Sequence, residues 1–304
     1  MKQQDKTTKK LLVNSIWLKL LLFLAVLVLL FLQLKDVDWQ KAEGLNLKYP
    51  LALVGSLALL PVNLGMEYLK WESIVRPLSI EEKYVKNAFW AGIASGFMTP
   101  NGWGNFLGRM IYFPKRDRLY IIASTAYANF AQLIPTLIFG LIAVLFVYSN
   151  QTRLGLYSAL ISIALLSLYF GLDRLIPKKK FENKWIRYVQ FLKGKLKQLR
   201  WRLLLFSIIR HLVFSLQFVM LFNAFGYTDF TQILLGVWVI YLLTSFVPSL
   251  WSGKVLIRET AALLVFKNTN ISVPDIIVVC ILIYVINIAL PAFLSSFVWL
   301  PKRK

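Results

Sequence analysis

Long apolar runs recur along the whole chain and constrain its fold more than any other feature. Residues 11–34, 119–148 and 273–299 each reach the ~20 residues that a helix needs to cross ~30 Å of hydrocarbon. Hydrophobic residues make up 58% of the chain and charged residues only 16%, against about 25% charged in soluble domains. The sequence therefore predicts an all-α, polytopic membrane protein with a single transmembrane domain over 1–304, and it excludes a soluble enzyme and a nucleic-acid binder.

Two of the apolar stretches are interrupted. We predict full crossings at 11–34, 50–70, 119–148, 153–175, 203–225 and 273–299. The stretches 83–113 and 231–267 are instead broken by TPNGWG at 99–104 and VPSLWSG at 247–253. The arms beside each break have only about 14 to 16 residues, or ~21–24 Å, which is short of a crossing. Because proline removes a backbone donor and glycine permits a turn, we expect a re-entrant hairpin at each break.

The positions of the basic residues indicate an orientation. With the N-terminus inside, the predicted cytoplasmic segments hold 26 lysines and arginines and the predicted external loops hold four. The positive-inside rule then places both termini in the cytoplasm and the chain in the cell membrane. The apolar run 11–34 is too long for the core of a signal peptide, so we expect it to be a retained span.

The segment 173–202 carries much of the positive charge and is expected on the cytoplasmic face. One interpretation is a solvated basic loop. The other is an amphipathic surface helix whose apolar side chains touch anionic headgroups. Those side chains would be Trp185, Ile186, Val189, Phe191 and Leu192.

The two interrupted stretches match each other. Their shared residues lie 148 or 149 positions apart, in the pairs Pro100 and Pro248, Trp103 and Trp251, and Arg109 and Arg258. The flanking spans follow with similar offsets, which divides the chain into repeats of about 11–148 and 153–299. Because the two repeats run in opposite directions through the membrane, we predict inverted-topology repeats. Interrupted segments at matching positions indicate a transporter's binding site.

Charges inside these arms are the first candidates for function. Arg258 and Glu259 lie in the apolar arm KVLIRETAALLVF, where a charge is costly unless it faces a partner or a cavity. Arg258 is expected to bind an anionic group such as a lipid phosphate, while Glu259 orients it, relays a proton or pairs with Arg109. The alternative is a purely structural pair. Lys254 adds positive potential at the second turn.

Turn residues complete the candidate binding site, and several have simpler interpretations. Polar groups at the turns either contact substrate or satisfy freed backbone groups, and the tryptophans either line a lipid-sized cleft or anchor the interface. These residues are Thr99, Pro100, Asn101, Trp103, Gly104, Pro248, Trp251 and Gly253.

Polar residues within the uninterrupted spans are expected to be structural. Glu67 is expected to pair with Lys70, Arg76 or another nearby cation, and Arg210 is expected to snorkel toward the cytoplasm. His211 is expected to be a hydrogen-bonded core residue. No nucleophile–base set, metal-ligand cluster or cofactor motif is present, so we expect no enzymatic activity, no metal and no cofactor.

At these motifs the sequence resembles the lysylphosphatidylglycerol synthase transmembrane-region family of flippase-like integral membrane proteins. The family's first motif is kept in TPNGWGNFLGR at Thr99, Pro100, Gly104 and Arg109, with Asn105 in place of a glutamate. The second is kept in VPSLWSGKVLIRETAALLVF at Pro248, Gly253, Arg258 and Glu259. The resemblance implies translocation of a phospholipid or a lipid-linked saccharide. It does not imply the synthase activity, because we expect the membrane spans to take up these 304 residues and leave none for a soluble synthase domain.

We therefore predict a flippase-like protein that translocates or binds an anionic membrane lipid or lipid-linked saccharide, with membrane lipids and no nucleic acid as partners. The alternative is a membrane-embedded lipid-modifying or glycosyl transferase, or a subunit of one. A third option is a scaffold that binds a partner through the segment 173–202. The lipid, the energy coupling and a homo-oligomeric state are left open by the sequence.

Overall fold

Helices are the regular elements of the chain wherever its structure is described. The computed structural model describes residues 46–99, 104–147, 152–175, 184–246 and 253–298. The helices, including one 3-10 turn (η2) and one π-helical turn (η4), are α3 (Pro50–Ala58), α4 (Leu60–Val75), η2 (Arg76–Leu78), α5 (Glu82–Phe97), α6 (Gly104–Met110), α7 (Arg118–Val147), α8 (Thr152–Leu175), α9 (Lys184–Ala224), α10 (Phe230–Phe246), α11 (Gly253–Val265), α12 (Val273–Tyr284), η4 (Val285–Ala289) and α13 (Leu290–Val298).

Four helical stretches are long and apolar enough to cross a membrane, as a multi-pass protein requires. They are Pro50–Leu78, Arg118–Phe146, Lys197–Ala224 and Val273–Phe297. Each coincides with a predicted span. Helix α8 matches the predicted span 153–175, although only Leu160–Gly171 qualifies as a shorter apolar helix. The predicted first span, 11–34, lies outside the described residues.

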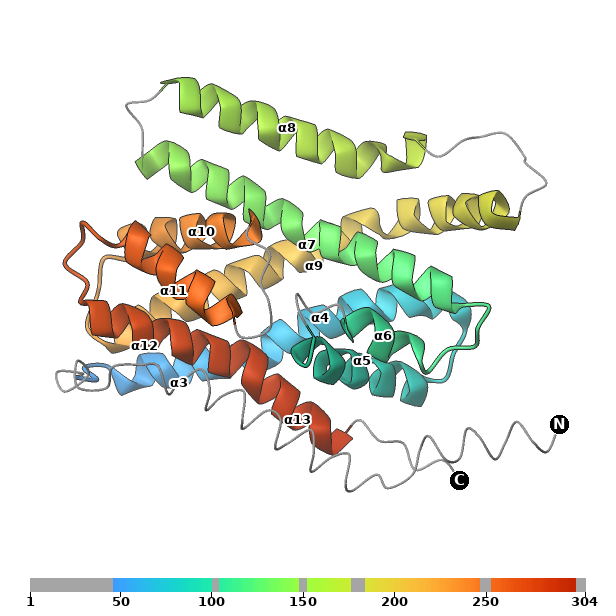
Figure 1. Ribbon diagram of the computed structural model, residues 1–304, viewed down its shortest axis with the longest axis horizontal. Coiled ribbons are helices and arrows are strands. Elements are labelled where there is room, and N and C mark those ends of the chain that lie inside the picture. Colours follow the sequence, from blue (N-terminus) through green and yellow to red (C-terminus); the bar gives the residue numbers. More distant parts are fainter. Residues whose placement is uncertain (1–45, 100–103, 148–151, 176–183, 247–252, 299–304) are drawn as a thin grey trace.

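Both predicted breaks separate two helices that pack against each other. Helix α5 lies along α6, and α10 lies along α11 (Figure 1). Helix α6 has only seven residues, or ~10 Å, so the first pair is too short to contain a second crossing. The structure thus shows a helical pair at each break, whereas entry of each pair from one membrane face stays a prediction.

Side-chain hydrogen bonds close the first break. The Thr99 hydroxyl donates to the Ser95 carbonyl at 3.0 Å and accepts from the backbone N–H of Gly104 at 2.6 Å. The Ser95 hydroxyl donates to the Gly104 carbonyl at 2.6 Å. Glycine is required where α6 meets α5, because a Cβ atom at Gly104 or Gly108 would clash with the backbone of α5. Thr99 therefore satisfies freed backbone groups, as its simpler interpretation predicts.

Most of the basic segment 173–202 is helical, as the surface-helix interpretation expects, whereas its contact with headgroups stays a prediction. Helix α8 ends at Leu175, and α9 then runs without a break from Lys184 to Ala224. Residues 184–202 are therefore helical rather than a loop, and only the part from Lys197 onward belongs to the stretch that is long and apolar enough to span a membrane. Lysine and arginine are strong helix formers, so their charge does not end the helix.

Two apolar clusters fill the bundle on either side of its charged residues. One joins α9, α10, α11 and α12, where the Phe222 and Phe266 rings meet edge to face at 5.1 Å. The other joins α4, α5, α7, α8 and α9, and in it Trp71 meets Phe113, from the loop before α7, at 5.7 Å. Helices α7 and α9 cross the centre of the molecule, and α8 lies outermost beside α7 (Figure 1).

Candidate functional site

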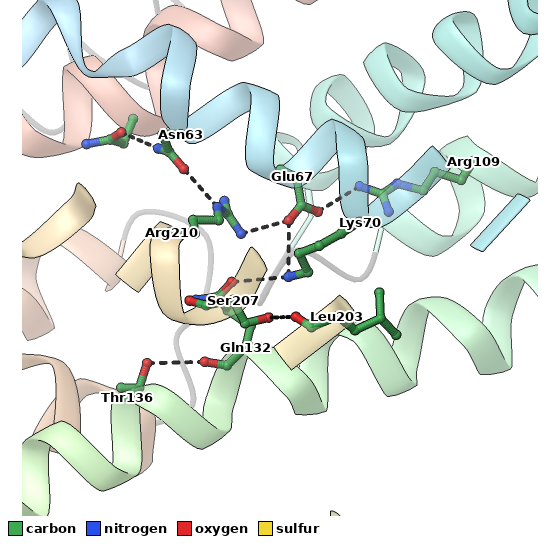
Figure 2. Close-up of polar contacts among 10 residues, drawn as sticks. Asn63, Glu67, Lys70, Arg109, Gln132, Thr136, Leu203, Ser207 and Arg210 are labelled. Atoms are coloured by element: carbon green, nitrogen blue, oxygen red, sulfur yellow. Dashed lines mark hydrogen bonds and ion pairs between the residues drawn. The ribbon is translucent and has the colours of Figure 1, made fainter. Parts of the chain in front are cut away.

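The carboxylate of Glu67 binds three basic side chains from three helices (Figure 2). Its Oε1 accepts from Arg109 Nη2 on α6 at 3.0 Å, and its Oε2 accepts from Arg210 Nη1 on α9 at 2.8 Å. Lys70 Nζ, one turn further along α4, lies 3.4 Å from Oε2. We call these four residues the charge cluster. It joins α4, α6 and α9 at one point inside the bundle.

The members of the charge cluster are buried to different degrees. The side chains of Lys70 and Arg109 are 2% exposed and that of Glu67 is 11% exposed, whereas that of Arg210 is 21% exposed. Charges inside a membrane protein are costly unless they are paired, which explains why all three cations converge on one carboxylate. Arg210 is the most exposed member and therefore the one most accessible from outside the charge cluster.

Two asparagines continue the charge cluster toward the C-terminal helices. Asn63 Oδ1 accepts from Arg210 Nε at 2.8 Å, and Asn63 Nδ2 donates to Asn287 Oδ1 at 2.5 Å. Asn287 lies in the π-helical turn η4, which interrupts the α12–α13 helix. Single π-helical turns occur often at functional sites, because the extra residue re-aims nearby side chains. Here the turn presents an amide to the partner of Arg210.

Gln132 connects the charge cluster to α7. Its Oε1 accepts from Lys70 Nζ at 3.1 Å, and its Nε2 donates to the Ser207 carbonyl of α9 at 3.3 Å (Figure 2). The bond from Lys70 is charge-assisted and anchors the ammonium group on the side away from Arg109. As a result, four helices fix the positions of the three cations.

Aromatic rings cover the arginine of the first break. Arg109 Cζ lies 4.7 Å from the centroid of the Trp71 ring and 5.9 Å from that of Phe89, which stabilises the buried guanidinium by cation–π contacts. Arg109 Nε is buried without a hydrogen-bond partner, as is Asn105 Oδ1. A Cβ atom at Gly92 would touch both of these atoms, so they lie in the same narrow space between α5 and α6.

The charge cluster carries a surplus of positive charge. Three cations pair with one carboxylate, and no other carboxylate among the described residues lies within 4.0 Å of the three cations. A surplus of two positive charges in a buried site is unfavourable without a counter-charge. The arrangement therefore favours an anion that approaches from the Arg210 side.

The structure places the predicted site residues in two groups and leaves others undescribed. Arg109 joins the charge cluster, and Thr99 and Gly104 form the turn beside it. Gly253 and Lys254 are the first residues of α11, which belongs to the second helical pair. Five predicted residues, Pro100, Asn101, Trp103, Pro248 and Trp251, lie outside the described residues.

Arg258 and Glu259 lie on α11 and are half-buried. Arg258 Nε is buried without a hydrogen-bond partner. The expected pair between Glu259 and Arg109 is wrong, because Arg109 is engaged by Glu67 on α4. The binding roles of Arg258 and Glu259 stay predictions.

Of the polar residues that were expected to be structural, some have the expected partners and others do not. The pair of Glu67 with Lys70 is confirmed, but the pairs with Arg109 and Arg210 were not expected. Arg210 does not snorkel, since its guanidinium donates to Glu67. His211 fits a core role: it is buried, its Nδ1 lies 3.3 Å from Thr136 Oγ1, and its ring stacks on Phe139 at 5.2 Å.

Comparisons with protein-family models, with curated proteins and with solved structures found no match. Within the described part of the chain, no group of three or more His, Cys, Asp or Glu residues is arranged to hold a metal ion. The functional proposal therefore depends on the chain's own residues.

Proposed function

We propose that this protein is a flippase-like membrane protein that binds an anionic lipid or lipid-linked saccharide and moves it across the cytoplasmic membrane. One observation carries the proposal, namely that three cations converge on a single carboxylate within helices long and apolar enough to span a membrane. An anionic headgroup supplies the missing negative charge.

Access and chemistry support a headgroup at Arg210. Arginine binds phosphate through parallel N–H bonds, and the partial exposure of Arg210 leaves part of its guanidinium open to a ligand. The lipid chains remain against apolar side chains on the outside of the bundle. Such side chains are abundant there, for example Leu51 on α3 and Ile163 on α8. A headgroup inside and chains outside is the arrangement that lipid translocation requires.

The helical pairs at the two breaks support the wider architecture of the proposal. They occur at matching places in the two halves, as an inverted repeat with two re-entrant hairpins requires. Arg109, at the end of the first pair, occupies the basic position of the motif that resembles the lysylphosphatidylglycerol synthase transmembrane-region family. The same proposal places both termini in the cytoplasm, on the basis of the positive-inside distribution.

The alternative of a lipid-modifying or glycosyl transferase needs an acidic or metal-binding catalytic loop. The described residues contain no grouping of this kind, and Glu67 is fully engaged by cations. No specific observation thus favours a transferase over a flippase-like protein.

Leaflet exchange in proteoliposomes tests the proposal. The full chain is reconstituted with headgroup-labelled anionic lipid, and loss of outer-leaflet label is followed over time. We expect exchange above that of empty liposomes, and loss of most of this exchange in Arg210→Gln. Lys86→Gln is the matched control, because Lys86 is an exposed lysine that pairs with Glu82 outside the charge cluster. Equal exchange in protein-free and protein-containing vesicles would contradict the proposal.

A further inference from the structure

We infer that the charge cluster selects a headgroup with two negative charges, a phosphate monoester or a diphosphate, over a phosphodiester with one. The inference rests on the proposed function and names the substrate class of the same site. It distinguishes lipids such as phosphatidic acid, polyprenyl phosphates and diphosphate-linked saccharides from monoanionic lipids such as phosphatidylglycerol.

Charge balance is the first reason. Glu67 neutralises one of its three cationic partners, which leaves two positive charges at a site of low exposure. A monoanionic phosphodiester would leave one buried charge uncompensated, whereas a dianionic group would compensate both. Because an uncompensated buried charge is strongly unfavourable, the dianion is the better ligand.

The available donors are the second reason. Arg210 donates through Nε to Asn63 and through Nη1 to Glu67, and no described residue accepts from its Nη2. Lys70 Nζ already contacts Glu67 and Gln132 and is almost fully buried, so it contributes positive potential rather than a free donor. A phosphate monoester presents three strong acceptor oxygens at its end, whereas a phosphodiester has ester substituents on two of its oxygens.

The order of exposure gives the direction of approach. Arg210 is the most exposed cation, and Lys70 and Arg109 are almost fully buried behind it. The phosphate oxygens therefore bind Arg210 directly. Arg109 is held by Glu67 and by the Trp71 ring, so it contributes mainly positive potential.

Lipid competition on the purified full chain tests this inference. Binding of phosphatidic acid, a polyprenyl phosphate, phosphatidylglycerol and inorganic phosphate is measured in lipid nanodiscs at about pH 7.5, where a monoester with its second pKa near 6 is mostly a dianion. We expect the two monoesters to bind at least about tenfold more tightly than phosphatidylglycerol, as one additional charge-assisted hydrogen bond would give. Lowering the pH to about 5 should remove this preference, because the monoesters then carry one charge.

Two variants reduce the positive surplus by one charge through different routes. Asn63→Asp places a carboxylate at the atom that accepts from Arg210 Nε, and Arg210→Gln removes a cation. Both should lower phosphatidic acid binding toward that of phosphatidylglycerol, and Lys86→Gln should not. Agreement between the two variants separates a charge effect from misfolding of either one.

The outcomes separate this inference from the proposed function. If wild-type protein binds and exchanges phosphatidylglycerol as well as the monoesters, the charge inference is overturned and the flippase-like function stands. If only inorganic phosphate binds and no lipid is exchanged, dianion selection stands but the lipid function fails. If no anion binds, both are overturned.

Discussion

Arg210 Nη1 lies 2.8 Å from Glu67 Oε2, although the two residues are 143 positions apart in the chain. The ion pair joins α4, in the first proposed repeat, to α9, in the second. Breaking a buried pair by removal of one partner leaves an uncompensated charge and is strongly destabilising. The contact is one of several polar links between the two halves, together with the Asn63–Arg210 and Gln132–Ser207 hydrogen bonds.

Glu67→Gln should destabilise the protein, because three cations would then lack a carboxylate. The expected loss is roughly 3–5 kcal/mol in the free energy of unfolding, as for other broken buried pairs. Thermal unfolding of the detergent-purified protein measures it. Glu72→Gln is the control on the same helix, because Glu72 is exposed. Equal melting temperatures for Glu67→Gln and wild type would show that the charge cluster does not hold the helices together.

Arg258→Ala should abolish lipid exchange while the protein still accumulates in the membrane. Arg258→Lys should restore exchange only in part, because lysine lacks the planar fork that binds phosphate at two points. Lys267→Ala provides a control, since Lys267 is an exposed cation just beyond the end of α11. Loss of accumulation with normal exchange by the surviving protein would assign Arg258 a structural role.

Gly108→Ala should separate α6 from α5, since the added methyl group would clash with the Ser95 hydroxyl and the Ala91 carbonyl. Overpacking of this kind costs about 1–3 kcal/mol. Gly171→Ala is the matched control, because a Cβ atom there meets nothing within 4 Å. Melting temperature and lipid exchange are both measured. A Gly108→Ala protein as stable as Gly171→Ala would show that the close approach is not needed.

Cysteine labelling from outside the cell should report the proposed topology. Buried Cys280 is first replaced by alanine to remove the native thiol. Cysteines at Lys41 and Arg153 should react with an impermeant reagent, and those at Arg118 and Lys195 should react only after permeabilisation. External labelling at position 118 would mean that the stretch 83–113 crosses the membrane.

The lengths of the apolar stretches in the sequence closely predicted the bounds of the long apolar helices. The predicted span 119–148 is α7, Arg118–Val147, and 273–299 contains the continuous helical stretch Val273–Val298. The agreement has a physical cause, because the thickness of the hydrocarbon fixes the length of an apolar helix. The break at 99–104 was likewise visible in its proline and glycines, and it separates α5 from α6.

The charge cluster could be predicted only in part. The pair of Glu67 and Lys70 follows from their spacing of three residues on one helix face. The pair of Glu67 with Arg210 could not be derived from local spacing, since it depends on how α4 packs against α9. One signal was available, namely an arginine well inside an apolar run with no acidic neighbour on its own helix face.

Helix α9 runs unbroken for 41 residues, which corresponds to ~61 Å and about twice the hydrocarbon thickness. Its basic first half and Arg210 therefore belong to one continuous helix. A rotation or tilt of the end near Lys184 would also move Arg210, which lies on the same helix. Under the proposed function, the length of α9 thus connects the basic segment at the membrane surface to the proposed headgroup site at Arg210.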